Sequence, residues 1–422
     1  MSQSPAPELF SWEFATDPYP AYAWLREHAP VHRATLPSGV EAWLVTRYGD
    51  ARQALADQRL SKNPAHHDEP AHAKGKTGIP GERKAELMTH LLNIDPPDHT
   101  RLRRLVSKAF TPRRVAEFEP RVQELTDRLI DDIVSKHHGG EKGAVGTADL
   151  IHEFAFPLPI YAICDLLGVP REDQDDFRDW AGMMIRHGGG PRGGVARSVK
   201  KMRGYLAELI HRKRLDPGDD LISGLIRASD HGEHLTENEA AAMAFILLFA
   251  GFETTVNLIG NGVYALLRNP EQRERLQASL AAGETELLAT GVEELLRYDG
   301  PVELATWRFA TEPLTLGGQD IRPGDPVLVV LAAADRDPER FAEPDILDLS
   351  RRDNQHLGYG HGIHYCLGAP LARLEGQIAL ASLLTRLPDL RLGADPAELR
   401  WRGGLIMRGL RTLPVEFTVP YN

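Results

Sequence analysis

The spacing of apolar and polar residues predicts a mainly helical chain with a small share of strand. Helical periodicity covers residues 98–136, with a break at Thr111-Pro112, and returns over 195–214 and 236–269. Strand-like alternation is short and lies near the two ends, at 30–47, 314–321, 327–331 and 415–419. Since the chain shows no internal repeat and no long linker, the pattern predicts a single domain over residues 1–422.

The longest helical stretch, 236–269, begins with a capping box in which Thr236 is the N-cap and Glu239 reaches back to it. Its roughly thirty residues extend about 45–50 Å, and apolar residues on nearly all sides predict a central position. A glycine, an acid and two hydroxyls interrupt its middle at 250–255 (AGFETT). Because Thr254 can bond back to the carbonyl four residues earlier and loosen the helix, we expect a groove for a small molecule and water. The alternative is a helix kink with a salt-bridged acid.

Composition narrows the class of protein. The chain is 42% hydrophobic and 26% charged, as in ordinary globular proteins, and a net charge of -11 argues against a general nucleic-acid binder. The N-terminal segment does not have the pattern of a secretion signal, and the most apolar run, 240–251, is too short to span a bilayer. The chain has two cysteines, too few for a disulfide scaffold. Cys164 lies in an apolar helical stretch and is expected in the core. Free thiols are typical of proteins in a reducing cytoplasm.

The other thiol lies in a glycine-rich segment, 357–375 (LGYGHGIHYCLGAPLARLE). Glycines at 358, 360, 362 and 368 allow the backbone to approach a flat object closely. A helical pattern begins at Leu367, so Cys366 precedes a helix start, where amide N–H groups favour a thiolate. A thiolate with His364 two residues before it suits an axial ligand of haem iron and a donor to a haem propionate. The alternative is a buried structural cysteine.

The segment resembles the haem-binding loop of the cytochrome P450 family, an aromatic residue followed by Gly-x-Gly-x-(His/Arg)-x-Cys-x-Gly. The matching residues are Tyr359, Gly360, Gly362, His364, Cys366 and Gly368. Tyr359 stands where the family usually has phenylalanine. The resemblance covers essentially the whole chain and is nearest to soluble, actinobacterial-type members. It implies the family's triangular-prism fold, mainly α with a minor β region, and haem b with Cys366 as the axial thiolate.

The resemblance also assigns residues to oxygen chemistry and to the core. It matches the interruption at 250–255, including Ala250, with the family's oxygen-binding motif, in which Thr254 hydrogen-bonds the oxygen and Glu253 gates proton delivery. Glu294 and Arg297, at positions i and i+3, match the Glu-x-x-Arg pair that fixes the core behind the cysteine loop. Arg340 is a possible third member of that pair.

Basic residues cluster around the start of the helical stretch 98–136. Asp95 is expected as the N-cap and Pro96 as the first helical residue. The resemblance implies that the haem propionates, which would be unstable if buried unpaired, are bound by His99, Arg103, Arg308 and His364. We define the basic patch as the remaining cations, Arg101, Arg104, Lys108, Arg113 and Arg114. If this helix lies on the cysteine side of the haem, the patch is expected to dock an acidic electron donor such as a ferredoxin; the alternative is a solvated helix face.

The implied activity is monooxygenation, in which O2, two electrons and two protons give one water and one oxygen atom inserted into a C–H or C=C bond. A peroxygenase using hydrogen peroxide could dispense with Glu253 and Thr254, and a non-catalytic haem-thiolate sensor or carrier would need no proton-delivery pair. The resemblance also implies a substrate pocket whose lining is apolar. Its residues are Leu91, Leu92, Met183, Met184, Phe245, Ala250, Val302, Leu304, Ala305, Leu405 and Ile406. Such a lining suits a macrolide, another polyketide, a terpenoid or a steroid. The glycine-rich segment 187–194 is expected to act as a flexible lid, and the protein as a monomer.

Overall fold

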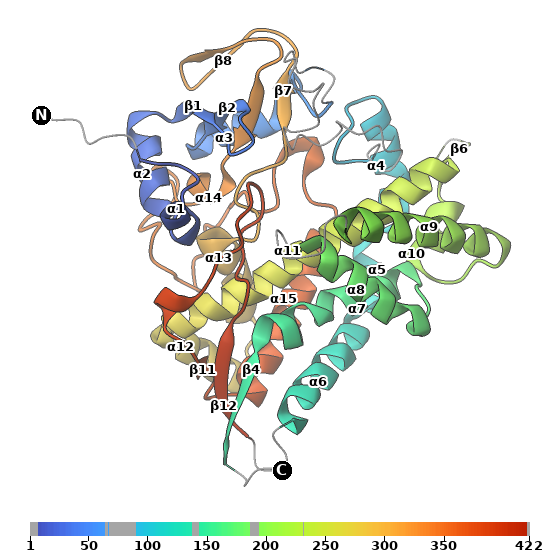
Figure 1. Cartoon of the computed structure of the whole chain (residues 1–422), viewed down its shortest axis with the longest axis vertical. Helices are drawn as coiled ribbons and strands as arrows, with labels where there is room; N and C mark the ends of the chain where they lie inside the picture. Colours follow the sequence, from blue (N-terminus) through green and yellow to red (C-terminus); the bar gives the residue numbers. More distant parts are fainter. Residues whose placement is uncertain are drawn as a thin grey trace, which may run out of the picture.

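Helices make up most of the described chain, and the strands form small sheets (Figure 1). The computed structural model describes residues 7–63, 66, 90–136, 143–185, 194–230 and 232–419. The helices are α1 (Trp12–Thr16), α2 (Tyr19–His28), α3 (Tyr48–Ala56), α4 (Asp98–Ala109), α5 (Pro112–Glu117), α6 (Glu119–Ser135), α7 (Pro157–Leu167), α8 (Gln174–Ile185), α9 (Gly194–Leu215), α10 (Leu221–Arg227), α11 (Glu237–Arg268), α12 (Pro270–Ala281), α13 (Glu286–Asp299), α14 (Leu331–Ala334) and α15 (Ala369–Arg386). The predicted break at Thr111-Pro112 is confirmed, because Thr111 caps α5 through its side chain.

Most of the described strands come from the two ends of the chain, as predicted. The strands are β1 (Val31–Thr35), β2 (Glu41–Val45), β3 (Leu60–Ser61), β4 (Val145–Asp149), β5 (Ser229–Asp230), β6 (Glu233–His234), β7 (Arg308–Ala310), β8 (Leu314–Leu316), β9 (Gln319–Ile321), β10 (Pro326–Val329), β11 (Arg391–Leu392) and β12 (Pro414–Thr418). Of these, β4, β5 and β6 lie in the middle of the chain. The largest described sheet has the order β1-β2-β10-β7-β3, and a second has the order β11-β12-β4. The predicted strand at 314–321 is a hairpin of two strands, turned at Gly317 and Gly318 with φ of 53° and 78°. The strand predicted at 327–331 ends at Val329, and Leu331 begins α14.

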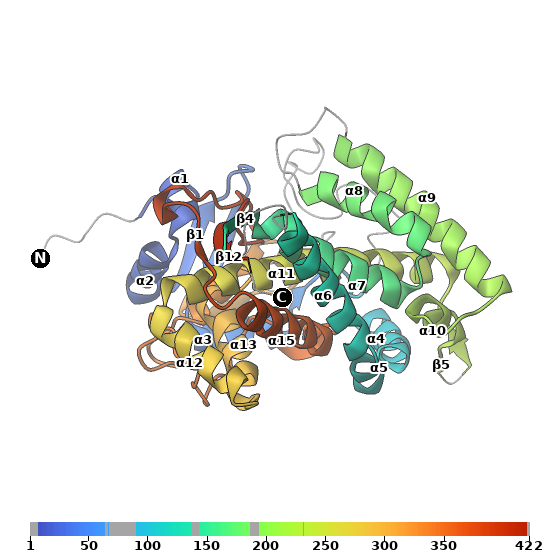
Figure 2. The ribbon, with the colours of Figure 1, turned by 90° about the horizontal axis from the view of Figure 1, so that it is seen from below.

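Helix α11 is central, as its sequence predicts, and the other helices surround it in both views (Figures 1 and 2). It packs against α7, α9, α13 and α15. The predicted capping box is present, with Thr236 and Glu239 bonded reciprocally. By length and composition α11 could cross a membrane, because apolar residues continue beyond the run ending at Gly251, but 61% of its most apolar window is buried inside the molecule. A long apolar helix that is mostly buried is typical of the core of a globular protein, and α11 has both properties.

Two helix starts differ from the sequence prediction. Asp95 is not an N-cap: α4 begins at Asp98, with Pro97 preceding it and no side-chain cap. Residues before a proline disfavour the helical conformation, so Asp95 and Pro96 stay outside the helix, and the Asp95 carboxylate accepts hydrogen bonds from Ser61 and from the Lys62 N–H (2.9 Å). The helix after the cysteine begins at Ala369 rather than Leu367, with Gly368 as its N-cap.

The molecule has a triangular outline, with the largest sheet at one corner and the long helices filling the remainder (Figure 1). This arrangement agrees with the expected mainly α architecture with a minor β region. The predicted lid, 187–194, lies outside the described residues except for Gly194, the first residue of α9.

Candidate active site

The cysteine loop connects the sheet-rich part of the chain to α15. Gly360 and Gly362 have φ of 75° and 74°, in the region where side chains with a Cβ are strained. A Cβ on Gly362 would lie 3.1 Å from the carbonyl oxygen of Leu55 in α3, so glycine also allows the loop to approach that helix. The loop is closed by the Cys366 N–H, which donates to the carbonyl of Tyr359 (2.9 Å). The glycine pattern therefore holds Cys366 at the start of α15.

The electrostatic surroundings of Cys366 only partly match the sequence expectation. Burial raises the pKa of its thiol, while the amide N–H groups of Gly368 and Ala369 and the guanidinium of Arg103 act in the opposite direction. The helix-start amides thus interact with the sulfur as expected, but burial outweighs them. A coordinated metal ion would reverse this balance, because a coordinating thiol is deprotonated outright.

Tyr359 places a polar atom next to this loop. Its ring is 9% exposed and lies under the Arg373 guanidinium, 4.5 Å from the ring centroid. The phenol oxygen is buried without a hydrogen-bond partner among the described residues. Burial raises the pKa of Tyr359 well above its ordinary value, so the added hydroxyl is neutral.

The four predicted propionate ligands lie in one region. The rings of His99 and His364 are 4.4 Å apart, and the buried Nε2 of His99 has no partner among the described residues. Arg308 is 3% exposed, and burial lowers its pKa to about 10. Burial, followed by nearby positive charges including that of Arg308, lowers the pKa of His364 to about 2. Arg103 is close enough for its charge to act on Cys366. One buried guanidinium, one partly buried guanidinium and an imidazole nitrogen without a partner among the described residues suit an anionic group.

The polar interruption of α11 borders open space. Thr254 donates from Oγ1 to the carbonyl of Ala250 (2.7 Å), which confirms the predicted back-bond. Ala250 is exposed and Thr254 partly exposed, although the helix is central, so this face borders a space inside the fold. Glu253 is buried, and its carboxylate opposes the lowering of the Arg402 pKa that burial causes. The structure thus places a buried acid next to an exposed face of the central helix.

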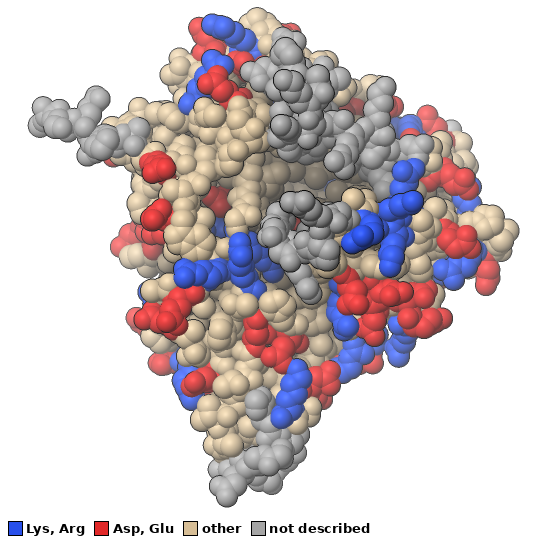
Figure 3. Space-filling model, in the orientation of Figure 1, with Lys and Arg blue, Asp and Glu red and all other residues tan. Residues whose placement is uncertain are grey.

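The predicted pocket residues come from segments that the structure brings together in part. Val302 pairs with Met407, and the carbonyl of Ile406 accepts from the Glu303 N–H (2.8 Å), so the segments at 302–305 and 405–407 lie side by side. Of the predicted residues, Leu91, Leu304 and Ala305 are buried in the core; Leu92, Met183, Phe245, Val302, Leu405 and Ile406 are partly exposed; the side chain of Met184 lies outside the described residues. Figure 3 shows a hollow between the sheet-rich part and the helices.

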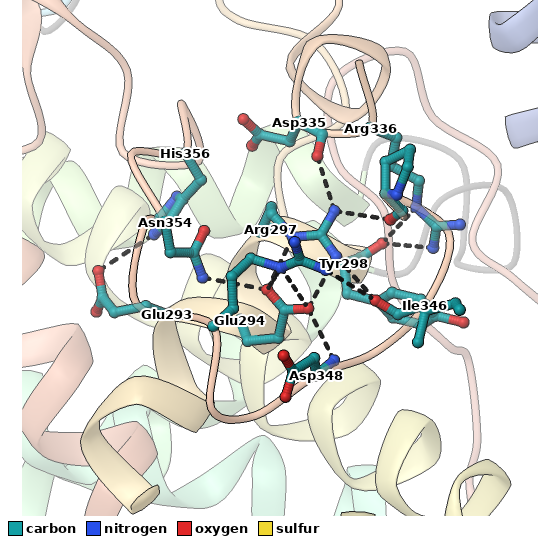
Figure 4. A network of polar contacts seen from close by, with 12 residues as sticks. Glu293, Glu294, Arg297, Tyr298, Asp335, Arg336, Ile346, Asp348, Asn354 and His356 are labelled. Atoms are coloured by element: carbon teal, nitrogen blue, oxygen red, sulfur yellow. Dashed lines mark hydrogen bonds and ion pairs between the residues drawn. The ribbon is translucent and has the colours of Figure 1, made fainter. Parts of the chain in front are cut away.

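Glu294 and Arg297 form a buried bidentate pair, with Arg297 Nε and Nη2 each 2.8 Å from a Glu294 oxygen (Figure 4). Both side chains are 0% exposed. The remaining guanidinium hydrogens go to main-chain carbonyls of Asp335, Pro344 and Ile346. Since these carbonyls belong to the segment that precedes the cysteine segment, the pair ties that preceding segment to α13.

The third member predicted for this pair is wrong. Arg340 bonds to Asp353 (2.5 Å) near the surface, whereas Arg351 reaches Glu294, with Nε 3.1 Å from the carboxylate. Arg340 follows Asp337 within a short turn, and its side chain lies over the Tyr48 ring instead of pointing towards α13. The spacing of residues along the chain does not indicate which arginine contacts the Glu294–Arg297 pair in the fold.

Sequence reasoning also missed a second link between α13 and the cysteine loop. Arg373 in α15 donates to both oxygens of Glu293 (2.7 and 2.9 Å), and His356 lies 3.2 Å from the same carboxylate. Burial raises the pKa of Glu293, but these hydrogen bonds outweigh it and hold the pKa at about 2. The available signal was a Glu-Glu dipeptide in α13 and an arginine near the start of α15.

Comparison with known proteins decides the family. The Cytochrome P450 family model matches residues 190–388. Cytochrome P450 107B1 of Saccharopolyspora erythraea is 45% identical over 423 aligned residues, covering 99% of each chain. The chain belongs to the cytochrome P450 family. Cytochrome P450 monooxygenase PikC of Streptomyces venezuelae is 47% identical and covers 96% of this chain and 92% of the relative. The structure of the Bacillus subtilis 168 bacillaene polyketide synthase cytochrome P450 PksS superimposes with a TM-score of 0.86 at 38% identity, covering 98% and 100% of the two chains.

Membership makes this cytochrome P450 a monooxygenase whose cofactor is haem with an axial cysteine thiolate. The described residues suit that cofactor. A partly buried thiol lies at a helix start. Among the described residues, His99 Nε2 has no hydrogen-bond partner and its ring lies against that of His364, on which buried cations act. Such groups suit the two carboxylates of haem.

Proposed function

We propose that this cytochrome P450 inserts one oxygen atom from O2 into an apolar natural product, by hydroxylation or epoxidation. The observation that carries the proposal is the pair Glu253 and Thr254 in the middle of α11, next to open space. A peroxygenase or a non-catalytic haem carrier would need no such pair. We also propose that the protein acts as a cytoplasmic monomer with a ferredoxin and its reductase.

In this proposal Cys366 gives the axial thiolate, and His99, Arg103, Arg308 and His364 bind the propionates. The bound haem supplies the redox centre at which O2 is activated. The Thr254 hydroxyl donates its hydrogen to the Ala250 carbonyl, which orients its oxygen so that it can accept a hydrogen bond from a group in the groove. Glu253 is buried one position earlier in the same helix and is the group that can supply a proton to the groove.

The first test concerns coupling. In Thr254→Ala, haem and substrate should still bind, but product per NADPH should fall about tenfold or more because protons no longer reach the groove in an ordered way. Glu253→Gln should behave likewise. Thr255→Ala is the matched control, since its hydroxyl bonds to the Gly251 carbonyl (3.0 Å) from a buried position. Unchanged coupling in the first two variants would leave the interruption as a structural kink.

A polyketide or macrolide substrate is favoured over a polar one. The expected lining is apolar, and the structurally similar PksS belongs, by its description, to a polyketide synthase. Terpenoids and steroids are also apolar and would suit the same lining. Titration of a compound library against the haem Soret band identifies the class, because a ligand that displaces water from the groove shifts that band.

The basic patch is proposed to dock the ferredoxin, although part of its charge is offset within the chain. Arg101 pairs with Glu239, Arg113 with Glu117 (2.8 Å) and Arg114 with Asp219 (2.8 Å). Arg104 and Lys108 are exposed on α4. Docking would therefore depend on cations that lie along α4 and the beginning of α5.

Reversing two of these charges, Arg104→Glu with Arg113→Glu, should slow reduction by a ferredoxin about tenfold at low salt and flatten its salt dependence. Substrate-induced spectral shifts should not change. Lys200→Glu with Lys201→Glu is the control, because these exposed lysines lie on α9, across α11 from α4 in Figure 2. Equal reduction rates in the Arg104/Arg113 variant and the wild type would make the patch an ordinary solvated surface.

A further inference from the structure

Lys62 lies buried beside the residues proposed to bind the propionates. It follows β3, in which Ser61 pairs with Phe309 of β7, so the antiparallel register places Lys62 opposite Arg308. Both side chains belong to residues that are 3% exposed. Like charges directly opposite each other on neighbouring strands are destabilising, and removing each from water costs more. Two buried positive charges in this position would be stabilised by an anion nearby.

The described residues satisfy the hydrogen bonds of Lys62 but give its ammonium group no direct ion pair. Nζ donates to Thr306 Oγ1 (2.5 Å), to the Thr306 carbonyl (3.0 Å) and to the Trp307 carbonyl (2.6 Å). All three acceptors are neutral. Among the described residues, no carboxylate lies within ion-pair distance of Nζ. Burial and the charge of Arg308 lower the pKa of Lys62, and Asp95 opposes them only partly.

The effects of Lys62 on its neighbours show that it belongs to the same cluster. Its positive charge is the second cause, after burial, that lowers the pKa of His364. Arg308 Nη1 donates to the Thr306 carbonyl (3.2 Å), which also accepts from Lys62. The lysine and the arginine are therefore held by one shared acceptor, and moving the first would move the second.

We infer that Lys62 is a fifth residue that binds the haem propionates, joining Arg103 and Arg308 as a cation, and a positioning residue for Arg308. This inference rests on the proposed haem site. Lys62 supplies positive charge to the region and, through Thr306, fixes the arginine that faces the carboxylates. The alternative is a purely structural clamp that ties the end of β3 to residues 306–307.

The two roles differ in their dependence on propionate charge. Holoenzymes containing haem or haem dimethyl ester, whose carboxylates are neutral, are compared by the rate at which they release the porphyrin to excess apomyoglobin. With haem, Lys62→Met should release it about tenfold to a hundredfold faster than the wild type, the range expected for a hydrogen-bonded buried charge. With the dimethyl ester, the wild type and Lys62→Met should release at the same rate. Lys62→Arg should retain haem better than Lys62→Met.

A second readout is the reduction potential of the haem. Loss of a nearby cation disfavours adding an electron, so the potential should fall in Lys62→Met and stay near the wild-type value in Thr306→Val, which keeps the cation. Equal acceleration of release for both porphyrins would overturn the inference in favour of the clamp. Failure of both Lys62→Met and Lys62→Gln to fold would do the same. A wild type that releases both porphyrins equally would instead contradict the proposed propionate site.

Discussion

Cys366→Ser is expected to abolish the reduced carbon monoxide difference band that is diagnostic of the family's haem-thiolate centre. A serine hydroxyl is a far weaker donor than a thiolate, and the amides of Gly368 and Ala369 would then face a neutral oxygen. Haem would be retained only by the cations around the propionates. The measurement is the difference spectrum of the dithionite-reduced protein with and without carbon monoxide.

Cys164→Ser is the matched control. Cys164 is 0% exposed in α7, and burial raises the pKa of its thiol, so it is a neutral core residue. Its replacement should leave the band intact, with a modest loss of stability. A band that persists in Cys366→Ser would contradict the assignment of the axial ligand.

Arg297→Met is expected to cost about 3–5 kcal/mol of unfolding free energy, the range measured when one member of a buried ion pair is removed. The change leaves the Glu294 carboxylate fully buried and removes the donor from three main-chain carbonyls. Because those carbonyls hold the loop before the cysteine segment, haem should be lost at lower urea concentrations as well. Urea unfolding followed by circular dichroism and by the Soret band measures both effects.

Arg340→Met tests whether the arginine that the sequence suggested as a third member contributes to stability as much as Arg297 does. Arg340 bonds to Asp353, whose side chain is 73% exposed, so the loss of stability should be much smaller. Arg351→Met should fall between the two, because Arg351 contacts Glu294 but the bidentate pair remains. Equal losses of unfolding free energy for Arg297→Met and Arg340→Met would mean that the buried network stabilises the fold no more than an exposed ion pair does.

Local patterns were enough to predict many features of the chain. The capping box, the back-bond of Thr254 and the break at Thr111 are hydrogen bonds between a side chain and the main chain no more than four residues away. Their geometry therefore follows from the local sequence. The glycines around Cys366 predict a tight loop for the same reason, because positive φ is available to glycine wherever it occurs. The ligand loop could therefore be located from the sequence.

Partners distant in sequence were decided by the tertiary structure. Packing decides that Arg351 rather than Arg340 contacts Glu294. It also decides that Asp95 binds Ser61 and Lys62 instead of capping a helix. At Cys366, it makes the effect of burial on the thiol pKa larger than that of the helix-start amides. Lys62 shows this most clearly, since it was an ordinary lysine in the sequence and became a buried cation only when β3 paired with β7. Spacing along a chain determines which residues share a helix face, but desolvation and long-range ion pairing depend on the surrounding fold, which the sequence pattern does not encode locally.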